Sequence, residues 1–295
     1  PVNTECGFII HSDQAIYTSS IAVSETLSLT TSKDIIRAIA KHEVHCAWLM
    51  ALGCATWSAD QLEQEIASDP AQYPLLSETQ YPDAYAFLLA MRDDILASPE
   101  VKFKTEFEWK LKIIHDDAVY NAFCAPGGYI YVYTGLMKYL DKVDHLAGVL
   151  AHEIAHADQR HSTASMTEQY GIETLVAIAS NNATAAQLSQ VAGGLTQLGF
   201  SRAHETDADE HSVDYLQSTK YACNGAAGFF TKLIAQGQGS STPAFLSTHP
   251  DPGNRVTKIN DRATELGCTT TLHHDDTSAS GDNGAYFTML GTLPQ

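Results

Sequence analysis

The segment His152-Glu-Ile-Ala-His156 constrains this chain more than any other part of its sequence. It lies within residues 144–160, whose apolar side chains recur at helical spacing and predict one helix with Asp144 at its N-cap. Two histidines four residues apart on a helix are about 40° apart around its axis, so both imidazoles point to one side. A stripe of small residues on another side would let a second helix approach closely: Gly148, Ala151 and Ala155.

The two histidines supply part of a predicted zinc site. Catalytic zinc is held by three protein ligands, and its fourth position stays open for water or substrate. Glu153, beside the first histidine, can act as a general base on a water bound to that zinc. A chance match is the alternative in a chain with 13 histidines, but a solvated face is a poor explanation for polar residues on a helix that is apolar on most sides. We therefore predict one zinc ion per chain, bound by His152 and His156.

The third ligand is predicted in a helix that begins after Ser201. Ser201 is a suitable N-cap, and Glu205 and Asp209 then lie on one helix face, four residues apart. Glu205 would bind the metal. Asp209 would accept a hydrogen bond from the non-ligating nitrogen of a zinc-bound histidine and so fix its ring. His204 and His211 are rival ligands, but neither has a carboxylate placed to support it in this way.

These motifs resemble the gluzincin-type zinc metallopeptidase family of the CAAX prenyl proteases, the HtpX heat-shock proteases and the mitochondrial Oma proteases. The resemblance rests on His152-Glu-x-x-His156 followed by Glu205-x-x-Ala208-Asp209. Two further segments agree with it. Residues 121–136 are similar to the hairpin that precedes the active-site helix in that family. Ser247-Thr-His249-Pro250, with Arg255 six residues after the histidine, is similar to its late His-Pro motif.

The resemblance covers about residues 60–268 and implies an α-rich α+β fold of the zincin type, with a small β-sheet or hairpin. It implies a zinc-dependent endopeptidase in which Glu153 activates the attacking water. It also implies that His249 stabilises the oxyanion, with Arg255 nearby; alternatively, His249 occupies the open zinc position at rest and must leave for activity. The chain is closest to the soluble bacterial envelope branch, because the membrane helices of the prenyl protease and HtpX branches are missing.

The hairpin is a candidate for substrate binding. Residues 122–133 are predicted to form two strands around Pro126-Gly-Gly128, with Tyr129 and Tyr131 on the same face of the second strand. An extended substrate could pair with that strand, which would favour unfolded or misassembled proteins whose backbone is accessible. Asn121, at the start of the hairpin, is either a contact for the substrate main chain or a turn residue.

The composition restricts the partners of this chain. Its net charge of −18, from 35 acidic and 17 basic residues, argues against nucleic acid and anionic membrane surfaces, because both require a basic footprint. The expected partners are polypeptide substrates. No apolar run reaches the ~18–20 residues that a membrane-spanning helix needs.

A shorter apolar run, residues 46–55, follows Arg37 and Lys41 and resembles the core of a signal peptide. Within it, Ala51-Leu-Gly-Cys54 resembles a bacterial lipoprotein processing site. By this interpretation Cys54 carries a lipid anchor and the protein belongs to the cell envelope, in the periplasm. A buried helix or an ordinary N-terminal segment is an equal alternative.

The predicted organisation has three parts. They are an N-terminal segment at 1–57 with the lipoprotein-type signal at 37–54, a zinc metallopeptidase domain at 58–268, and a polar, irregular tail at 269–295. Cys223 and Cys268 could form a disulfide in an oxidising compartment, and free thiols are the alternative. Helices are predicted at 60–69, 83–97, twice within 163–200, at 225–236 and from Asp251 to Gly267, and a strand at 110–115.

Two other functions stay open to sequence reasoning. One is a non-catalytic or latent chaperone or assembly factor of the cell envelope that keeps the zinc fold for binding. The other is a zinc hydrolase of a non-peptide amide or ester. Glu153 argues against the first, because a pure binding module needs no general base. The order of four matching motifs argues against the second.

Overall fold

The chain forms two compact units in the computed structural model: residues 1–62 with 170–189, and residues 63–169 with 190–295. Cys54 and the predicted helix at 60–69, apart from Ile66, lie outside the described residues. The residues that the structure describes are 7–11, 20–22, 28–30, 48–52, 66, 73–171, 185–235, 244–249, 254–270 and 282–294.

Four strands of the first unit form an antiparallel sheet in the order β2-β3-β1-β4. Strand β4 (Trp48–Leu52) lies within the apolar run that resembles a signal-peptide core. It pairs with β1, so that Gly7 lies opposite Leu52. A strand is a further explanation for the apolar character of residues 48–52. The other strands are β1 (Gly7–His11), β2 (Ser20–Ala22) and β3 (Ser28–Thr30).

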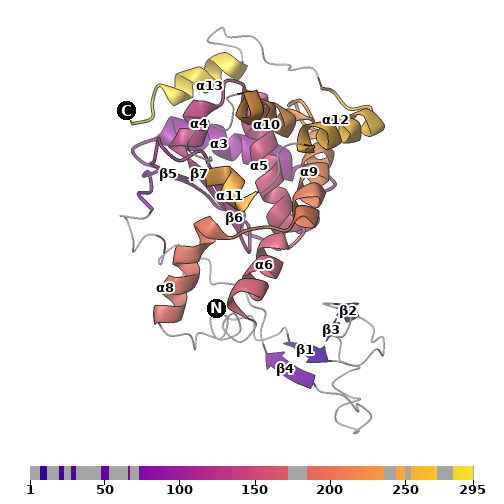
Figure 1. Ribbon diagram of the computed structural model, residues 1–295. Helices are drawn as coiled ribbons and strands as arrows, with labels where there is room; N and C mark the ends of the chain where they lie inside the picture. The colour runs from indigo at the N-terminus through magenta and orange to yellow at the C-terminus, as the bar shows by residue number, and fades with distance from the viewer. Residues whose placement is uncertain are drawn as a thin grey trace. The chain divides into compact units, whose positions relative to one another are not determined.

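Helix α5 (Val143–Asp158) is the centre of the second unit (Figure 1). It packs against helices α9 (Arg202–Leu216) and α10 (Gly225–Ala235) and against strand β6 (Ala122–Ala125). Every residue of α5 except His145 is buried. The predicted helix is thus confirmed, and the two histidines of its metal motif lie where other elements enclose them.

The start of α5 differs from the prediction. The helix begins before Asp144, and the N-cap residue Lys142 makes no side-chain cap hydrogen bond. Asp144 instead accepts a hydrogen bond from the backbone N–H of Ala222, with 2.8 Å between Oδ1 and N. This N–H is buried, so it requires a protein acceptor, and Asp144 is the residue that supplies it.

Helices α5 and α10 approach each other at small residues. A Cβ added to Gly148 would lie 2.0 Å from the backbone nitrogen of Ala226, and one added to Gly225 would lie 2.1 Å from the carbonyl oxygen of Asp144. Neither position has room for a side chain. The predicted close approach at Gly148 is therefore confirmed, and the partner is α10.

The small sheet of the second unit corrects one prediction. Strand β7 (Tyr129–Tyr133) lies between β5 (Leu111–Ile114), which is parallel to it, and β6, which is antiparallel to it with Cys124 opposite Ile130. Both edges of β7 are therefore occupied, and it cannot accept a substrate strand as predicted. The hairpin turn contains Gly127 and Gly128, both at positive φ, which glycine adopts without strain.

The remaining helical elements confirm the α-rich α+β fold class. The predicted helix at 83–97 is α3, and the helical pair within 163–200 corresponds to α6 and α8. The elements are α3 (Pro82–Leu96), α4 (Thr134–Tyr139), α6 (His161–Tyr170), α8 (Ala185–Gly194), the 3-10 helix η1 (Leu195–Gln197), α11 (Ala244–Thr248), α12 (Arg255–Leu266) and α13 (Asp282–Leu290).

Helix α13 lies in the segment predicted to be an irregular polar tail. It packs against α3, and the hydroxyl of Tyr286 donates a hydrogen bond to the carbonyl oxygen of Met137. The prediction is wrong for residues 282–290, because Tyr286, Met289 and Leu293 recur at helical spacing and join the hydrophobic core.

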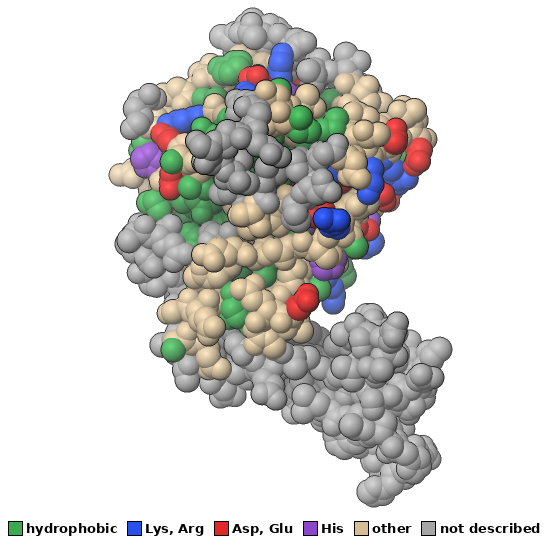
Figure 2. Space-filling model, viewed as in Figure 1, with side chains coloured by type: hydrophobic (Ala, Val, Ile, Leu, Met, Phe, Trp, Pro, Cys, Tyr) green, Lys and Arg blue, Asp and Glu red, His purple; other side chains and the backbone are tan. Residues whose placement is uncertain are grey.

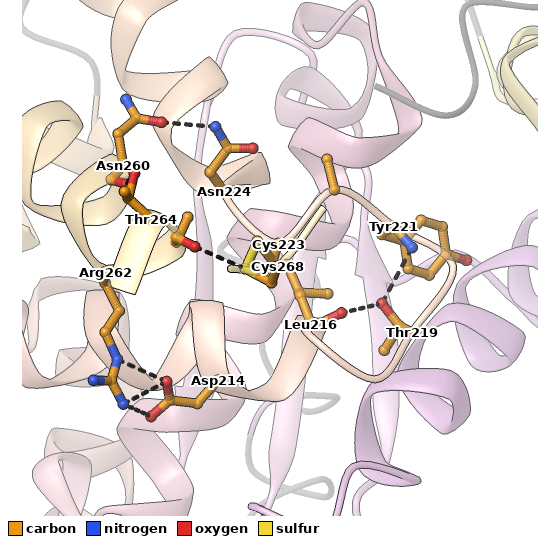
Figure 3. Close-up of a disulfide and its surroundings, with 12 residues drawn as sticks. Asp214, Leu216, Thr219, Tyr221, Cys223, Asn224, Asn260, Arg262, Thr264 and Cys268 are labelled. Atoms are coloured by element: carbon orange, nitrogen blue, oxygen red, sulfur yellow. Dashed lines mark hydrogen bonds and ion pairs between the residues drawn. A yellow bond between two sulfur atoms is a disulfide. The ribbon is translucent and has the colours of Figure 1, made fainter. Parts of the chain in front are cut away.

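Helix α12 is attached to its neighbours near its C-terminal end (Figure 3). A disulfide joins Cys268, just after the helix, to Cys223, which precedes α10. Arg262 forms an ion pair with Asp214 of α9, with 2.8 Å between Nη2 and Oδ1. The helix ends at Gly267, whose φ of 59° is the left-handed conformation expected for a C-cap glycine. The candidate disulfide is therefore present, and with the ion pair it fastens α12 to α9 and α10.

Charged side chains of both signs lie on the surface of the second unit (Figure 2). On the face shown in Figure 2, basic side chains lie scattered among acidic ones over the region of α9 and α12. In the part of the chain that the structure describes, no helix has the length and apolar character needed to cross a membrane.

We predict that Gly148→Ala destabilises the second unit by about 1–3 kcal/mol, since the new methyl group must displace the backbone of α10. Urea unfolding would measure the loss. Gly199→Ala is the control, because a Cβ at Gly199 would meet no atom within 4 Å. Equal stability of the two variants would contradict the close contact between α5 and α10.

Candidate metal centre

The two histidines of α5 face each other through their Nε2 atoms. The Nε2 atoms of His152 and His156 are 3.0 Å apart, and both side chains are buried. Two nitrogens bound to one tetrahedral zinc are separated by roughly 3.3 Å at ordinary Zn–N distances. The i, i+4 spacing on a helix thus produces the separation that a shared zinc requires.

Helix α9 contributes the third donor. The side chain of Ser201 accepts a hydrogen bond from the backbone N–H of His204, as expected for an N-cap. Glu205 then lies in the first turn, with carboxylate oxygens 3.6 Å from His152 Nε2 and 3.5 Å from His156 Nε2. Its side chain is buried. The structure therefore brings Glu205 to both histidines.

His249, just beyond α11, completes the cluster. Its Nδ1 lies 3.0 Å from Glu205 Oε1 and 3.4 Å from His152 Nε2. The four donor atoms of His152, His156, Glu205 and His249 all lie within 4.8 Å of one another. Three imidazoles and one carboxylate match the ligand preference of zinc, so the donor set fits one zinc ion. The rival ligands His204 and His211 lie outside this group.

Asp209 and Arg255 support the donor atoms from behind. Asp209 Oδ1 is 3.0 Å from His152 Nδ1, on the side of the ring away from the other donors. Arg255 binds Asp209 through Nε and Nη2, at 2.7 and 2.6 Å, and its Nη1 is 2.7 Å from Glu205 Oε2. Its guanidinium also lies 4.0 Å from the ring centre of Phe230. Arg255 thus holds two carboxylates in place, and one of them belongs to the donor Glu205.

Glu153 is buried beside the donors but is not one of them. In the described part of the chain, neither of its carboxylate oxygens has a hydrogen-bond partner. His249 lies close to it, with 3.5 Å between His249 Nε2 and Glu153 Oε1. Burial raises the pKa of Glu153 above its usual value. A carboxylate with a raised pKa and free oxygens at a metal site suits a general base.

Burial and neighbouring charged groups shift the pKa values of the donor residues in opposite directions. Burial alone would lower the pKa of His152, but hydrogen bonds to Asp209 and Glu205 raise it to about 9. Burial lowers the pKa of His156 well below its usual value. Burial would raise the pKa of Glu205, but the neighbouring His249 and His152 hold it far below its usual range. The carboxylate of Glu205 is therefore ionised, as a metal ligand must be.

Aromatic rings enclose the histidines. Phe200 stacks on His156 with 3.8 Å between ring centres, and Phe245 stacks on His249 with 4.1 Å. A pocket lies between β6, the segment that precedes α9 and the C-terminal end of α11. It is lined by Phe123, Cys124, Leu195, Leu198, Phe200, Thr248 and His249.

The predicted substrate contacts are buried and are not among the metal donors. Tyr129 and Tyr131 are buried in the central strand β7, and Tyr131 stacks on Phe123 with 4.7 Å between ring centres. This packing makes both tyrosines part of the core. Asn121 lies at the start of the edge strand β6 and is also buried, and its backbone oxygen accepts a hydrogen bond from the Tyr133 N–H.

Sequence reasoning missed the environment of His161. The Nδ1 atom of His161 is 3.2 Å from Nδ1 of His156, and its Nε2 is 3.1 Å from Asp207 Oδ2. Burial, together with the neighbouring His204, lowers the pKa of His161 to about 4. A spacing of five residues does not place two side chains on one helix face, so the periodicity of the sequence carries no signal for this contact.

The model of peptidase family M48 matches residues 88–263, more than half of the chain and all of the donor residues. The chain belongs to peptidase family M48. This membership confirms the resemblance drawn from the four motifs, and together with the donor set it confirms the zinc prediction.

Curated relatives match the same region. The beta-barrel assembly-enhancing protease of Escherichia coli K12 is 33% identical over 206 residues, which are 65% of this chain and 40% of that protein. The mitochondrial metalloendopeptidase OMA1 of Schizosaccharomyces pombe is 34% identical over 161 residues, 52% of this chain and 47% of that protein. The chain therefore spans less than half the length of these relatives.

The N-terminal segment has different relatives. Residues 1–70 match a family described as AlgH-like. A UPF0301 protein of Thioalkalivibrio sulfidiphilus is 51% identical over 69 residues, 23% of this chain and 37% of that protein. Sequence reasoning missed this similarity, which includes residues 37–54, the predicted signal. The chain thus joins part of an AlgH-like sequence to a peptidase sequence.

We predict that Asp209→Ala lowers zinc affinity about 10- to 100-fold, since it removes the acceptor that orients His152. Competition with a chromogenic chelator would measure this. Asp214→Ala is a matched control, because Asp214 also lies on α9 and pairs with an arginine of α12, but it is not among the donor or supporting residues. An equal loss of affinity in both variants would contradict a specific role for Asp209.

Proposed function

We propose that this chain is a zinc-dependent endopeptidase in which Glu153 is the general base. The observation that carries the proposal is the buried group of four metal donors with the free carboxylate of Glu153 beside it. Membership of a peptidase family supports the same chemistry. Relatives with protease names, such as the metalloprotease YcaL of Escherichia coli K12, add to this support.

The roles of the residues follow from their positions. Zinc on this donor set would polarise the scissile carbonyl and lower the pKa of the attacking water. Glu153 takes the proton of that water and delivers it to the leaving amine. Asp209 holds His152 through Nδ1, and Arg255 holds Asp209 and Glu205 together, so both keep the donors aligned.

The position of His249 supports a resting state in which its ring occupies the metal site. Its Nδ1 points at the donor atoms and its Nε2 at Glu153, so the ring occupies the space that the substrate carbonyl would need. This favours the interpretation that His249 takes the fourth zinc position at rest. A role as oxyanion donor requires the ring to move to the side of the substrate, and this is the alternative outcome.

Substrate binding is proposed at the edge strand β6. Because β7 is enclosed by two strands, β6 is the strand of this sheet that borders α5 and the pocket. Residues of β6 that alternate with those bonded to β7 direct their backbone groups outward. The Cys124 carbonyl is one of these groups, and because it already accepts a hydrogen bond from Ser162 Oγ, a substrate strand would pair with β6 before this residue. An extended substrate would add beside β6 and start near Asn121. Tyr129 and Tyr131 would support β6 from within the core.

The substrates are proposed to be unfolded or misassembled proteins of the bacterial cell envelope. Strand addition requires an accessible backbone, which folded proteins do not offer. The name of the Escherichia coli relative connects that protein with β-barrel assembly, and this supports an envelope location for the present chain. A lipid anchor at Cys54 stays a separate prediction, which mass spectrometry of the native N-terminus would test.

A non-catalytic chaperone or assembly factor is the alternative function. Such a protein could keep the metal donors for stability alone. It would have no use for a buried carboxylate without hydrogen-bond partners, because burying such a group is unfavourable unless function requires it.

We predict that wild type cleaves casein and that Glu153→Gln lowers turnover about 10²- to 10⁴-fold, because the amide cannot accept the proton of the attacking water. Zinc content should be near one ion per chain in both. Equal zinc with equal activity would rule out Glu153 as the base.

Denatured substrate should be cleaved faster than its folded form, and equal rates would contradict recognition by strand addition.

We predict that His249→Ala raises basal turnover several-fold, since it removes the ring that lies among the donors at rest. Initial rates on a quenched-fluorescence peptide, at equal zinc content, would measure this. Ser247→Ala, an exposed position in α11 two residues before His249, is the control. A sharp fall in turnover would instead assign His249 to the oxyanion, and no change would remove both roles.

A further inference from the structure

The two histidines of the metal motif are supported in different ways. His152 has a buried carboxylate, Asp209, directly behind its Nδ1. Behind Nδ1 of His156 lies a second imidazole, that of His161, at 3.2 Å. Behind His161 lies Asp207, with 3.1 Å between Nε2 and Oδ2, and the Asp207 side chain is 43% exposed. The second histidine of the motif is thus connected to a carboxylate through an intervening ring.

The directions of these hydrogen bonds follow from the ligand role of His156. A neutral imidazole that binds metal through Nε2 carries its proton on Nδ1. His156 therefore donates to Nδ1 of His161. A neutral His161 that accepts at Nδ1 carries its own proton on Nε2, which then donates to Asp207. Each ring has one tautomer compatible with its two neighbours.

The backbone of the α5–α6 junction places His161 in this position. α5 ends at Asp158, and Arg160 adopts a φ of 63°, a left-handed conformation that is unfavourable for a residue with a side chain. This turn starts α6 at His161 and returns its ring toward His156. The guanidinium of Arg160 lies 4.4 Å from the ring centre of Phe103, a cation–π contact that offsets part of the cost.

His161 is held firmly on its other sides. Its ring stacks on that of His204 of α9, with 4.4 Å between centres and 13° between planes. The next residue, Ser162, is buried and donates to the Cys124 carbonyl of β6. Asp207 also has His211 near it, but at 3.5 Å, so His161 is the closer partner. The ring therefore cannot turn away from His156 without breaking several contacts.

We propose that His161 is a positioning residue for the metal ligand His156, with Asp207 as the anchor of its tautomer. The proposal rests on the proposed function in so far as His156 binds zinc. It assigns a role to a histidine outside the donor set, and it makes α9 the support of both ligand histidines. Asp209 supports His152 directly, and Asp207 supports His156 through His161.

The test compares zinc affinity, by chelator competition, and the visible spectrum of the Co²⁺-substituted protein. His161→Leu removes the acceptor and should lower affinity about 10- to 100-fold. His161→Asn retains a side-chain oxygen near the position of Nδ1 and should recover much of it. His145→Leu, which removes a histidine at the opposite end of α5, should leave both readouts unchanged. Equal losses in His161→Leu and His161→Asn would assign His161 to packing alone and overturn the proposal.

A second variant keeps the test decisive if His161→Leu fails to fold. Asp207→Ala changes a half-exposed side chain and should lower zinc affinity less than the loss of His161 itself. Combined with His161→Asn, its effect should be less than additive, since both act through one ring. No effect of Asp207→Ala, or full additivity, would overturn the proposal that Asp207 supports His156 through His161.

A wild-type protein that binds no zinc would refute the proposed function, whereas one that binds zinc without cleaving peptides would refute only the catalytic step.

Discussion

The buried charge between α5, α9 and α12 is the constraint on which the rest of the second unit depends. Glu153, Glu205 and Asp209 are buried together, and Arg255 is the cationic side chain buried with them. Ionised groups are costly to bury unless an opposite charge compensates them. With the histidines neutral, as metal ligands must be, one guanidinium balances one of three carboxylates, so the ionised cluster carries an excess of about two negative charges. A divalent cation among the donors would neutralise it. The raised pKa of Glu153 has the same origin, because protonation is the other way to remove charge from a buried site.

This electrostatic requirement explains why α9 and α12 are fastened so closely to α5. Arg255 can pair with Asp209 and Glu205 only if the start of α12 lies against α9. The ion pair of Arg262 with Asp214 and the disulfide of Cys223 with Cys268 hold the rest of α12 in place. The absence of a side chain at Gly148 lets α10 approach α5 on its other side. Charge balance thus joins α5, α9 and α12, and packing at Gly148 adds α10 to this group.

Sequence reasoning succeeded where a contact follows from the period of one helix. The pairs His152 with His156 and Glu205 with Asp209 are four residues apart. In the structure the two histidines face each other, and the two carboxylates both contact the ring of His152. It failed where the contact depends on a turn or on tertiary pairing. His161 reaches His156 only through the left-handed Arg160, and the central place of β7 depends on the distant strand β5. Tyr286 and Met289 had the spacing of a helix, but their polar neighbours concealed it. Similarity to AlgH-like sequences cannot be derived from physical patterns at all, because the strands of residues 1–62 carry no catalytic motif.

The enclosure of the metal site links its aromatic and polar parts. The N–H of Phe200, just before α9, donates to the carbonyl of Thr248, 3.1 Å away, so the segments that carry Phe200 and His249 are bonded to each other. Phe200 stacks on His156, and His249 lies among the donors, so this bonded pair of segments covers the site from the side of β6. A substrate strand beside β6 would occupy the pocket between them. A backbone movement at Thr248 and His249 that left Phe200 in place would break this bond and leave two buried backbone groups unsatisfied. The two segments are therefore expected to move together.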